Sequence, residues 1–378
     1  MSKTIVRAVT VSMSVDFFSP MVKDLKLKGY NIISVSSPGP ELESLRNLGV
    51  RTIEIPMERR MAPMKDLKSL MLLIRTFRKE KPYMVHSMTP KAGLLCMLAA
   101  WLSRVPKRVH TFTGLVWPTS TGMNQKILML TDWLTCACAT HIIPEGEGVK
   151  KDLQQHITKK PMKVLGYGNV RGVDMERFSR RTEVMELAKL MKQEGLFTFV
   201  FVGRIVADKG INELMEAFER LYKQYNNARL LMIGKIESDL DPLKDQTMKI
   251  LLGHSGVEYV GPKYGDELLA CYAASDCFVF PSYREGFPNT VMEAGAMGLP
   301  SIVTDINGSR EIIEHGVNGV IIPSKDVDAL YNAMEQILID KKRTQVMANN
   351  ARPMIESRFE QSFVQKCLFD FYDEILND

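Results

Sequence analysis

The sequence has no long apolar run and few cysteines, and each absence excludes a class of protein. Its longest uninterrupted apolar segment, Ala92 to Leu102, is shorter than the roughly 18 residues of a membrane-spanning helix. The six cysteines form no Cys-x-x-Cys pair, which argues against a zinc site or a disulfide framework. The N-terminus shows neither the apolar core nor the cleavage site of a secretory signal. We therefore expect a soluble or peripheral protein of the cytoplasm with reduced thiols.

The composition is that of an ordinary globular protein. The 378 residues are 45% hydrophobic and 25% charged, which leaves room for two domains with substantial cores. Charge is unevenly distributed: residues 1–180 hold 28 Lys and Arg against 14 Asp and Glu, a net +14, whereas residues 181–378 hold 21 against 30, a net −9. Chance variation between two surfaces is one interpretation. The other is that the first half faces an anionic partner such as membrane head groups or a phosphorylated lipid.

Short apolar runs alternate with amphipathic stretches along the whole chain, which indicates repeated βα units around parallel sheets. Expected strands are 5–9, 32–35, 52–55, 84–86, 109–113 and 142–143, then 197–202, 230–233, 257–260, 277–280, 301–303 and 319–322. Expected helices include 64–79, 92–104, 212–224, 266–274, 289–297 and a final amphipathic segment at 363–376. Glycines and charges interrupt the pattern near 166–181, so we expect two α/β domains, 1–168 and 169–358, and a C-terminal helical segment, 359–378, that packs across the domain junction.

One segment, Cys277 to Pro300, combines a strand, a tight loop and a helix. Pro288 suits the first helical position, so the free backbone N–H groups around it can bind phosphate or sugar hydroxyls. Glu285 precedes the helix and Glu293 lies inside it, roughly 7 to 8 Å further along. Two such carboxylates could hold opposite ends of an extended ligand such as a nucleotide sugar, although glutamates at this spacing are also common on a solvated helix face.

A second segment, Phe199 to Phe218, places cations at the end of an apolar strand. Arg204 follows Gly203, and Lys209 opens the next helix. Two cations beside a helix N-terminus can bind a diphosphate whose charge grows as its bond to a sugar breaks, and they could replace a metal ion. An ordinary salt-bridged loop is the alternative.

Together these segments resemble the retaining glycosyltransferases of family 4. The Glu-x7-Glu motif of that family stands here as EGFPNTVME, from Glu285, and its Gly-Arg to Lys-Gly element as GRIVADKG, from Gly203. Flanking matches are SDCFVFPS, EAGAMGLP, TDINGSREII and GVNGVIIP. The segments VHSMTPKAGLL and RVHTFTGLVW resemble the branch that builds bacterial capsular and O-antigen polysaccharides.

The resemblance implies a GT-B fold, in which two Rossmann-like domains face each other across a cleft. The first domain would bind the acceptor and the second the nucleotide sugar. The implied donor-binding residues are Gly203, Arg204 and Lys209 for the diphosphate, Glu293 for the ribose, and Glu285, Gly286, Phe287, Asn289 and Thr290 for the sugar and the helix start. The implied reaction is sugar transfer with retained anomeric configuration, most often from a UDP-sugar, with Glu285, Arg204 and Lys209 as catalytic residues and no metal or cofactor.

The first half departs from the family pattern at one position. A Thr-x-His-Gly segment common in this branch reads Thr111 to Gly114 here, so Thr113 stands where the histidine would lie near the sugar. His110, three residues earlier, is a possible substitute, but the strand should direct it to the opposite face from Thr113. We expect Thr113 to line the sugar pocket as a fourth catalytic residue, and we assign acceptor contacts to His110 and Lys91, although Lys91 could equally be solvated.

The expected partners are a nucleotide-sugar donor, a saccharide linked to a polyprenyl diphosphate and an anionic membrane surface, with peripheral attachment to the inner face of the cytoplasmic membrane. Nucleic acid is not expected, because no RNA-binding, helix-turn-helix or zinc-finger pattern occurs. Two Asp-x-Asp tripeptides, at Asp239 and Asp326, match a metal-binding signature; we interpret them as accidental, the second as a helix cap. Alternatives are a UDP-sugar epimerase or phosphorylase of similar fold and a non-catalytic subunit of a polysaccharide assembly complex.

Overall fold

The computed structural model describes residues 3–59, 61–237 and 241–377, which divide into two compact units. Unit 1 holds the chain up to Gly172 together with the segment from Ser362 onward, and unit 2 holds Val173–Gln361. The observed division therefore falls slightly after the expected boundary at residue 168. That the final helix packs across the domain junction stays a prediction.

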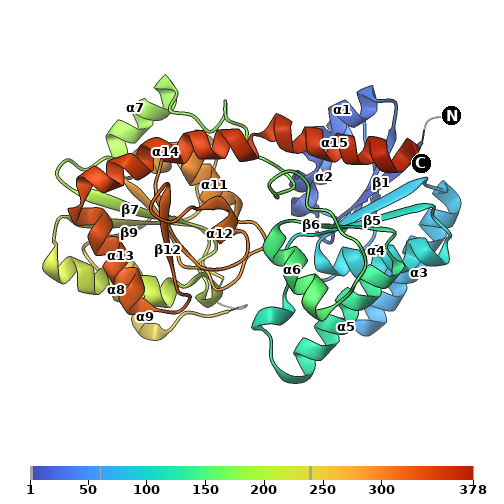
Figure 1. Ribbon diagram of the computed structural model, residues 1–378, viewed down its shortest axis with the longest axis horizontal. Helices are drawn as coiled ribbons and strands as arrows, with labels where there is room; N and C mark the ends of the chain where they lie inside the picture. The colour runs from blue at the N-terminus through green and yellow to red at the C-terminus, as the bar shows by residue number, and fades with distance from the viewer. Residues whose placement is uncertain (1–2, 60, 238–240, 378) are drawn as a thin grey trace. The chain divides into compact units, whose positions relative to one another are not determined.

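Unit 1 is built on a six-stranded parallel sheet in the order β3-β2-β1-β4-β5-β6 (Figure 1). The strands are β1 Thr4–Ala8, β2 Asn31–Ser36, β3 Arg51–Glu54, β4 Met84–Met88, β5 Lys107–Phe112 and β6 His141–Pro144. The helices are η1 Ser12–Phe17, η2 Ser19–Met21, α1 Val22–Leu27, α2 Leu42–Asn47, α3 Pro63–Glu80, α4 Pro90–Leu102, η3 Trp117–Thr119, α5 Gly122–Cys138, α6 Glu147–His156 and α15 Gln361–Asn377.

Both faces of this sheet are buried, as the near-continuous apolar strands predict. Alternate residues of β1 face opposite sides: Val6 joins a core formed with α3 to α6, whereas Ile5 joins a core formed with α1, α2 and α15. Helix α15 thus completes the second core with residues that lie far along the sequence from β1. Phe371 and Tyr372 of α15 are almost fully buried there.

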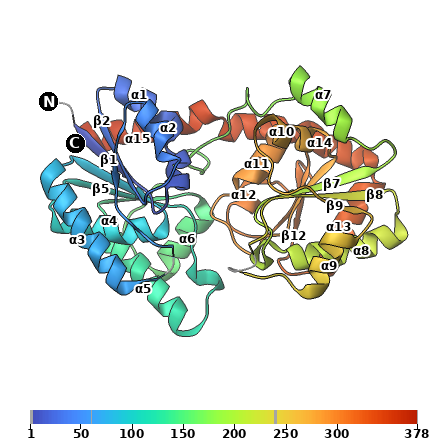
Figure 2. The same cartoon turned by 180° about the vertical axis from the view of Figure 1, so that it is seen from behind.

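Unit 2 repeats the architecture with the order β12-β11-β10-β7-β8-β9. Its strands are β7 Phe197–Val202, β8 Ala228–Ile233, β9 Val257–Tyr259, β10 Cys277–Phe280, β11 Ser301–Thr304 and β12 Gly319–Ile322. Its helices are α7 Thr182–Met191, η4 Ala207–Lys209, α8 Ile211–Gln224, α9 Asp245–Gly253, α10 Gly265–Ala273, α11 Asn289–Ala296, α12 Ser309–Ile312, α13 Val327–Ile339 and α14 Lys341–Phe359. Helices α9 and α13 pack against α8, which buries Ile211, Leu214, Met215 and Phe218 along one stripe (Figure 2).

All twelve expected strands are confirmed, as is the parallel α/β class, and the six expected helices appear with ends shifted by a few residues. The sequence analysis did not identify several helices, among them α5, α13 and α14. All six cysteines are free thiols, and five of them are buried. Within the described ranges, no helix combines the length and the apolar character needed to cross a bilayer.

Candidate functional site

Each sheet has one point where the strand order reverses direction. In unit 2 the two adjacent strands at this point are β7 and β10, and in unit 1 they are β1 and β4. Ligands of open α/β sheets bind beyond the carboxyl ends of the strands at such a point. In unit 2 the segments that leave these ends are Gly203–Gly210 and Pro281–Pro288, the two segments that the sequence analysis identified.

Lys209 and Glu285 meet at this point and form an ion pair between Nζ and Oε1. Their side chains are only 12% and 17% exposed, so the pair is shielded from water more than a surface salt bridge is. Ser282, which follows β10, is fully buried and its hydroxyl donates to Oε1 of Glu285 at 2.8 Å. The carboxylate is therefore fixed by two partners, and Ser282 is a site residue that the sequence analysis missed.

A close backbone contact brings the two segments together. Gly210 has φ +72°, and a Cβ atom there would lie 2.1 Å from the carbonyl oxygen of Pro281, so only glycine fits. The amide of Tyr283 donates to the carbonyl of Asp208 at 2.8 Å across the same junction. This contact explains how Lys209 reaches a carboxylate that lies 76 residues later in the sequence.

Arg204 lies at the same edge but has a different partner. Its Nη1 is 3.2 Å from Oε2 of Glu237, and its side chain is 42% exposed. A second guanidinium, that of Arg284, lies 3.2 Å from Oδ2 of Asp208. Among the described residues, the edge thus holds three cations that are each paired with one carboxylate, and an incoming anion would compete with these carboxylates for the cations.

Helix α11 begins directly after this loop. Pro288, which was expected at the first helical position, is instead the N-cap, and no side chain of the described residues caps the helix. Gly286 and Phe287 are buried, and Gly308 packs on them so closely that a Cβ atom there would lie 2.3 Å from the Gly286 carbonyl oxygen. The N-terminus of α11 is therefore a rigid, positively polarised end, with Asn289 and Thr290 partly exposed in its first turn.

Glu293 lies one turn further into α11, beside the fully buried Tyr272. Burial, reinforced by the charge of Glu293, raises the pKa of Tyr272 well above its ordinary value. The phenol therefore stays protonated even at alkaline pH. Of the expected donor residues, Lys209 and Glu285 are in contact beside the start of α11. Arg204 follows β7, as Lys209 does, and Glu293 lies deeper in α11.

The expected acceptor residues Lys91 and His110 and the expected pocket residue Thr113 lie in different surroundings in unit 1. Lys91, at the start of α4, is 11% exposed and its Nζ is 2.7 Å from Asp66 of α3. His110 is 1% exposed, its Nδ1 is hydrogen-bonded to the Ser87 hydroxyl at 2.8 Å, and burial lowers its pKa to about 3. Thr113 follows the end of β5 and is partly exposed. Thr113 therefore lies at the carboxyl edge of the sheet, whereas His110 is a neutral residue of the interior, and the roles expected for both residues stay predictions.

A strained residue marks the switch point of unit 1. Thr89, just after β4, has φ +71° and ψ 144°, a region that non-glycine residues rarely adopt. Its hydroxyl oxygen accepts from the amide of Thr10 at 3.0 Å and is hydrogen-bonded to the Thr10 hydroxyl at 2.7 Å. The sequence shows only that Thr89 precedes Pro90, which predicts an extended ψ but not the sign of φ.

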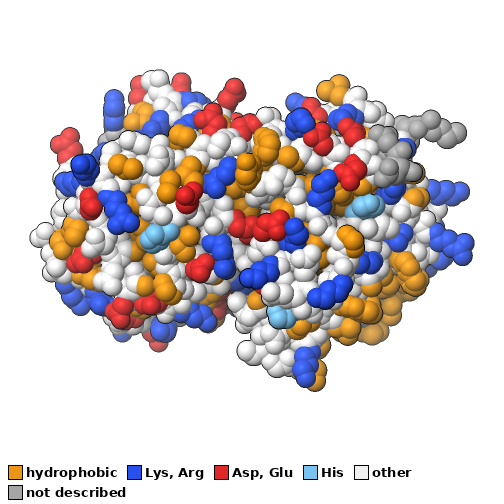
Figure 3. All heavy atoms as spheres, viewed as in Figure 1, with side chains coloured by type: hydrophobic (Ala, Val, Ile, Leu, Met, Phe, Trp, Pro, Cys, Tyr) orange, Lys and Arg blue, Asp and Glu red, His pale blue; other side chains and the backbone are white. Residues whose placement is uncertain are grey.

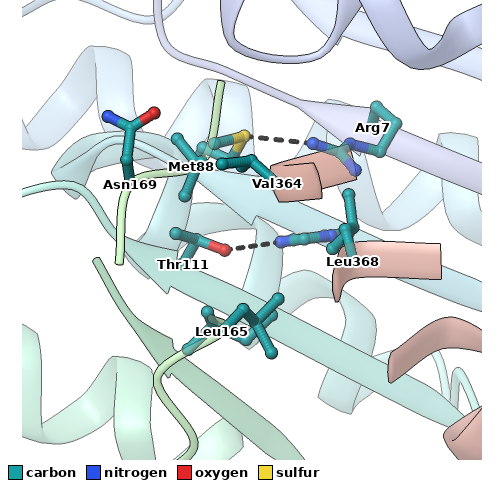
Figure 4. A pocket seen from close by; sticks show the side chains of 10 residues that line it. Arg7, Met88, Thr111, Leu165, Asn169, Val364 and Leu368 are labelled. Atoms are coloured by element: carbon teal, nitrogen blue, oxygen red, sulfur yellow. Dashed lines mark hydrogen bonds between the residues drawn. The ribbon is translucent and has the colours of Figure 1, made fainter. Parts of the chain in front are cut away.

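A cavity of about 10 Å³ lies within unit 1, beneath α15 (Figure 4). Arg7 lines it and is almost fully buried without a carboxylate partner among the described residues; its Nη1 donates to the Tyr372 hydroxyl at 2.5 Å. The chain of hydrogen bonds continues from Tyr372 to His86 Nδ1 at 2.5 Å and from His86 Nε2 to the Thr111 hydroxyl at 2.7 Å. Burial and then the charge of Arg7 lower the pKa of His86 well below its ordinary value. A space of this size can hold about one water molecule and is too small for a sugar.

Across the part of the chain that the structure describes, no group of three His, Cys, Asp or Glu side chains could hold a metal ion. Asp239 and the residue after it lie outside the described residues. Asp326 caps α13 by accepting a hydrogen bond from the Ala329 amide at 2.9 Å, which confirms the helix-cap interpretation.

Comparison with known proteins identifies relatives over the whole chain. A model of glycosyl transferases group 1 matches residues 186–354, and a glycosyl transferase 4-like model matches residues 8–142. The capsular polysaccharide biosynthesis glycosyltransferase CapM of Staphylococcus aureus is 32% identical over 100% of this chain and 98% of its own length. UDP-Gal:alpha-D-GlcNAc-diphosphoundecaprenol alpha-1,3-galactosyltransferase of Escherichia coli is 30% identical over 87% of this chain and 84% of its own length. Among solved structures, Anabaena HepE in complex with UDP superposes with a TM-score of 0.80 at 17% identity, covering 99% of this chain and 100% of that chain.

Proposed function

Because the chain belongs to the group 1 and 4-like glycosyltransferases and has their GT-B fold, we propose that it transfers a sugar, with retention, from a UDP-sugar to a lipid-linked saccharide. We propose a role in capsule or O-antigen polysaccharide synthesis; the name of the Staphylococcus aureus relative, a capsular polysaccharide glycosyltransferase, supports it. The observation that carries the proposal is the shielded ion pair of Lys209 and Glu285 at the switch point of unit 2.

The donor diphosphate would bind where the cations now hold carboxylates. Lys209 and Arg204 would contact its oxygens, together with the backbone at Gly203. The free N–H groups at the start of α11, around Gly286, Phe287, Asn289 and Thr290, would bind sugar or phosphate oxygens. Glu293, in the second turn of the helix, would accept from the ribose hydroxyls.

Entry of the diphosphate would release Glu285 from Lys209. The freed carboxylate then accepts from hydroxyls of the sugar and favours the positive charge that develops at its anomeric carbon. The bond from this carbon to the phosphate oxygen breaks, and its electron pair stays on the departing UDP. The acceptor oxygen attacks on the same face and passes its proton to the departing phosphate, so the configuration is retained without a carboxylate nucleophile. Lys209 and Arg204 would supply the positive charge, and we propose that no metal or cofactor takes part.

The acceptor would bind at the carboxyl edge of unit 1. Thr113 is the candidate hydrogen-bond partner at this edge, and Lys91 would have to leave Asp66 in order to bind an acceptor phosphate. A saccharide linked to a polyprenyl diphosphate is a substrate of this kind, as the name of the Escherichia coli relative indicates for that protein. Such a substrate requires peripheral attachment to an anionic membrane, which we place at the cytoplasmic face.

The test is release of UDP from a panel of UDP-sugars, with and without polyprenyl-diphosphate-linked saccharides, in buffer that contains EDTA. We expect release that requires both substrates, and a product with the anomeric configuration of the donor by NMR. Loss of all turnover in EDTA would overturn the metal-independent proposal, and an inverted product would overturn retention. Isomerisation of the UDP-sugar without an acceptor would favour an epimerase, and no reaction across the panel would favour a non-catalytic subunit.

A further inference from the structure

Helix α5 exposes an apolar face where a helix of a soluble domain ordinarily exposes polar residues. Met123, Ile127, Leu130 and Trp133 recur at helical spacing and are 70%, 39%, 55% and 50% exposed. The opposite side of the helix, with Thr135 and the two cysteines near its end, packs into the core. Helix α5 is therefore apolar on both sides, and only one side has a partner within the described chain.

The apolar face continues over the neighbouring helices. Helix α4 packs between α3 and α5 on this side of the sheet. Large exposed apolar side chains on α3 and α4 are Met64, Leu67, Met71, Trp101 and Leu102. Hydrophobic side chains gather over α3 and α5 on the surface that Figure 3 shows. We call the exposed surface of α3, α4 and α5 the outer layer; patches of this kind mark sites of interaction with proteins or membranes.

The outer layer is also strongly basic. Residues 63–138 hold 11 Lys and Arg against three Asp and Glu, a net +8. Two of the three acidic residues are paired, Asp66 with Lys91 and Glu80 with Arg51. The third, Asp132, is largely buried, which raises its pKa to about 7. Within the described ranges, nine cations of this segment have no acidic partner: Lys68, Arg75, Arg78, Lys79, Lys81, Arg104, Lys107, Arg108 and Lys126.

On the opposite face of unit 1, lysines are paired with acidic residues of α15. Helix α15 covers that side of the sheet, and its acidic residues neutralise lysines there: Asp373 is 2.8 Å from Lys28, and Glu374 is 2.6 Å from Lys163. Residues 63–138, which include the outer layer, therefore carry most of the excess positive charge of unit 1. A negatively charged surface would attract the outer layer more strongly than the α15 side, where the charges are paired. Unit 1 would therefore have a preferred orientation near such a surface.

We propose that the outer layer of α3, α4 and α5 is the membrane-docking face of the protein, with its apolar side chains at the lipid interface and its lysines and arginines on anionic head groups. Exposed apolar residues and tryptophans on the same segment as many cations are the composition of interfacial membrane-binding surfaces. A second copy of the chain is a less suitable occupant, because pairing two outer layers would bring two groups of unpaired cations together. The inference rests on the proposed function, since a lipid-linked acceptor gives the protein a reason to bind a bilayer.

The tryptophans supply a direct assay. The chain has three; Trp101 and Trp133 lie on the outer layer, whereas Trp117 is 6% exposed. Binding to vesicles of equal parts phosphatidylcholine and phosphatidylglycerol should shift emission to the blue, and brominated lipids should quench it. Pure phosphatidylcholine should give little effect at moderate salt. The variant Trp101→Phe/Trp133→Phe, which keeps only Trp117, should bind but show almost no quenching.

Co-sedimentation with the same vesicles tests the face itself. Met123→Glu/Ile127→Glu should weaken binding at least about ten-fold, since it replaces apolar side chains with repelled charges. The matched control is Leu27→Glu on α1, which changes a side chain that is 85% exposed on the opposite side of the same unit and should bind like the wild type. Thermal unfolding of both variants verifies that they are folded.

Equal binding by the two variants would overturn the proposal. So would loss of a dimer by Met123→Glu/Ile127→Glu in sedimentation velocity, which would assign the face to a second copy. The assay remains informative if the proposed function fails, because vesicle binding needs no substrate. If the proposed function holds, this variant should keep its turnover on an acceptor with a short, water-soluble lipid and lose it on an acceptor embedded in vesicles.

Discussion

The switch points of the two sheets have the same topology and different chemistry. In unit 2 the edge holds three cations, each paired with a carboxylate: Lys209 with Glu285, Arg204 with Glu237 and Arg284 with Asp208. In unit 1 the corresponding edge holds the hydroxyls of Thr10 and Thr89, and its lysine is bound to Asp66 on a neighbouring helix. The comparison teaches that the fold provides an edge at which ligands can bind, while the residues after each strand decide whether that edge suits a diphosphate or an uncharged group.

Removal of charge from the unit 2 edge should have the largest effect. Lys209→Met should lower kcat/KM for the donor about 10²- to 10³-fold, because the lysine would stabilise the departing diphosphate. Arg204→Ala should weaken donor binding less, since Arg204 is more exposed. Steady-state release of UDP measures both. The matched control is Lys223→Met on α8, an exposed lysine that pairs with Glu219 at 3.7 Å and should have wild-type kinetics. A loss no larger than that of the control would remove Lys209 from the site.

Lowering the pH, which favours protonation of the buried histidines of unit 1, should have the next largest effect, on the free energy of unfolding. Burial lowers the pKa of His110 to about 3, so His110 is neutral in the folded state at pH 5, and burial also lowers the pKa of His86 well below its ordinary value. The histidines of the unfolded chain bind protons below about pH 6.5. The free energy of unfolding should therefore fall with decreasing pH below about 6.5, by up to roughly 1.4 kcal/mol per pH unit for each histidine.

Urea titrations that follow tryptophan fluorescence measure this effect selectively, since all three tryptophans lie in unit 1. His110→Phe should reduce the slope in acid because it removes one of the two groups. A transition midpoint that is the same at pH 7 and pH 5 would contradict the neutral, buried state of both histidines.

A smaller effect is expected from the hydroxyl that fixes Glu285. Ser282→Ala removes a hydrogen bond of 2.8 Å to the carboxylate and should lower kcat about ten-fold with little change in donor KM. The control is Ser301→Ala on β11, another fully buried serine, whose hydroxyl has no hydrogen-bond partner in the described part of the chain. If both variants lose activity equally, the loss reflects packing and not the position of Glu285.

The smallest effect is expected at the uncharged edge. Thr113→Val keeps the shape of the side chain and removes one hydroxyl, so it should raise the acceptor KM about three- to ten-fold and leave the donor KM unchanged. Initial rates with each substrate varied in turn separate the two constants. An unchanged acceptor KM would show that Thr113 does not contact the acceptor.

Most of the fold was predictable because its strands are apolar on both faces. Segments such as FTFVFV, which forms β7, have no other stable environment than a covered parallel sheet. Helix α5 was not predicted, because it has apolar residues on both its buried side and its exposed side. Such a pattern lacks the periodicity that identifies a helix. Helix α14 has a similar difficulty, since Pro353 interrupts a mostly polar sequence.

The site was predictable as a set of residues but not as an arrangement. Motif spacing identified Lys209 and Glu285, yet only the adjacency of β7 and β10 brings them into contact. The role of Ser282 depends on the same adjacency. The φ of Thr89 is a tertiary effect, held by its hydrogen bonds to Thr10, and no local sequence pattern encodes its sign.

Helix α15 has a consequence for how the protein is made. During translation, residues 1–172 of unit 1 leave the ribosome first. Leu368, Phe371 and Tyr372, which complete one of the two cores of unit 1, are synthesised only after the whole of unit 2. The face of the unit 1 sheet that α15 covers therefore stays exposed to solvent while unit 2 is translated. Expression of residues 1–172 alone should consequently give a poorly soluble product, and a circular permutant that begins near Ser362 would let the first unit finish folding before the second emerges.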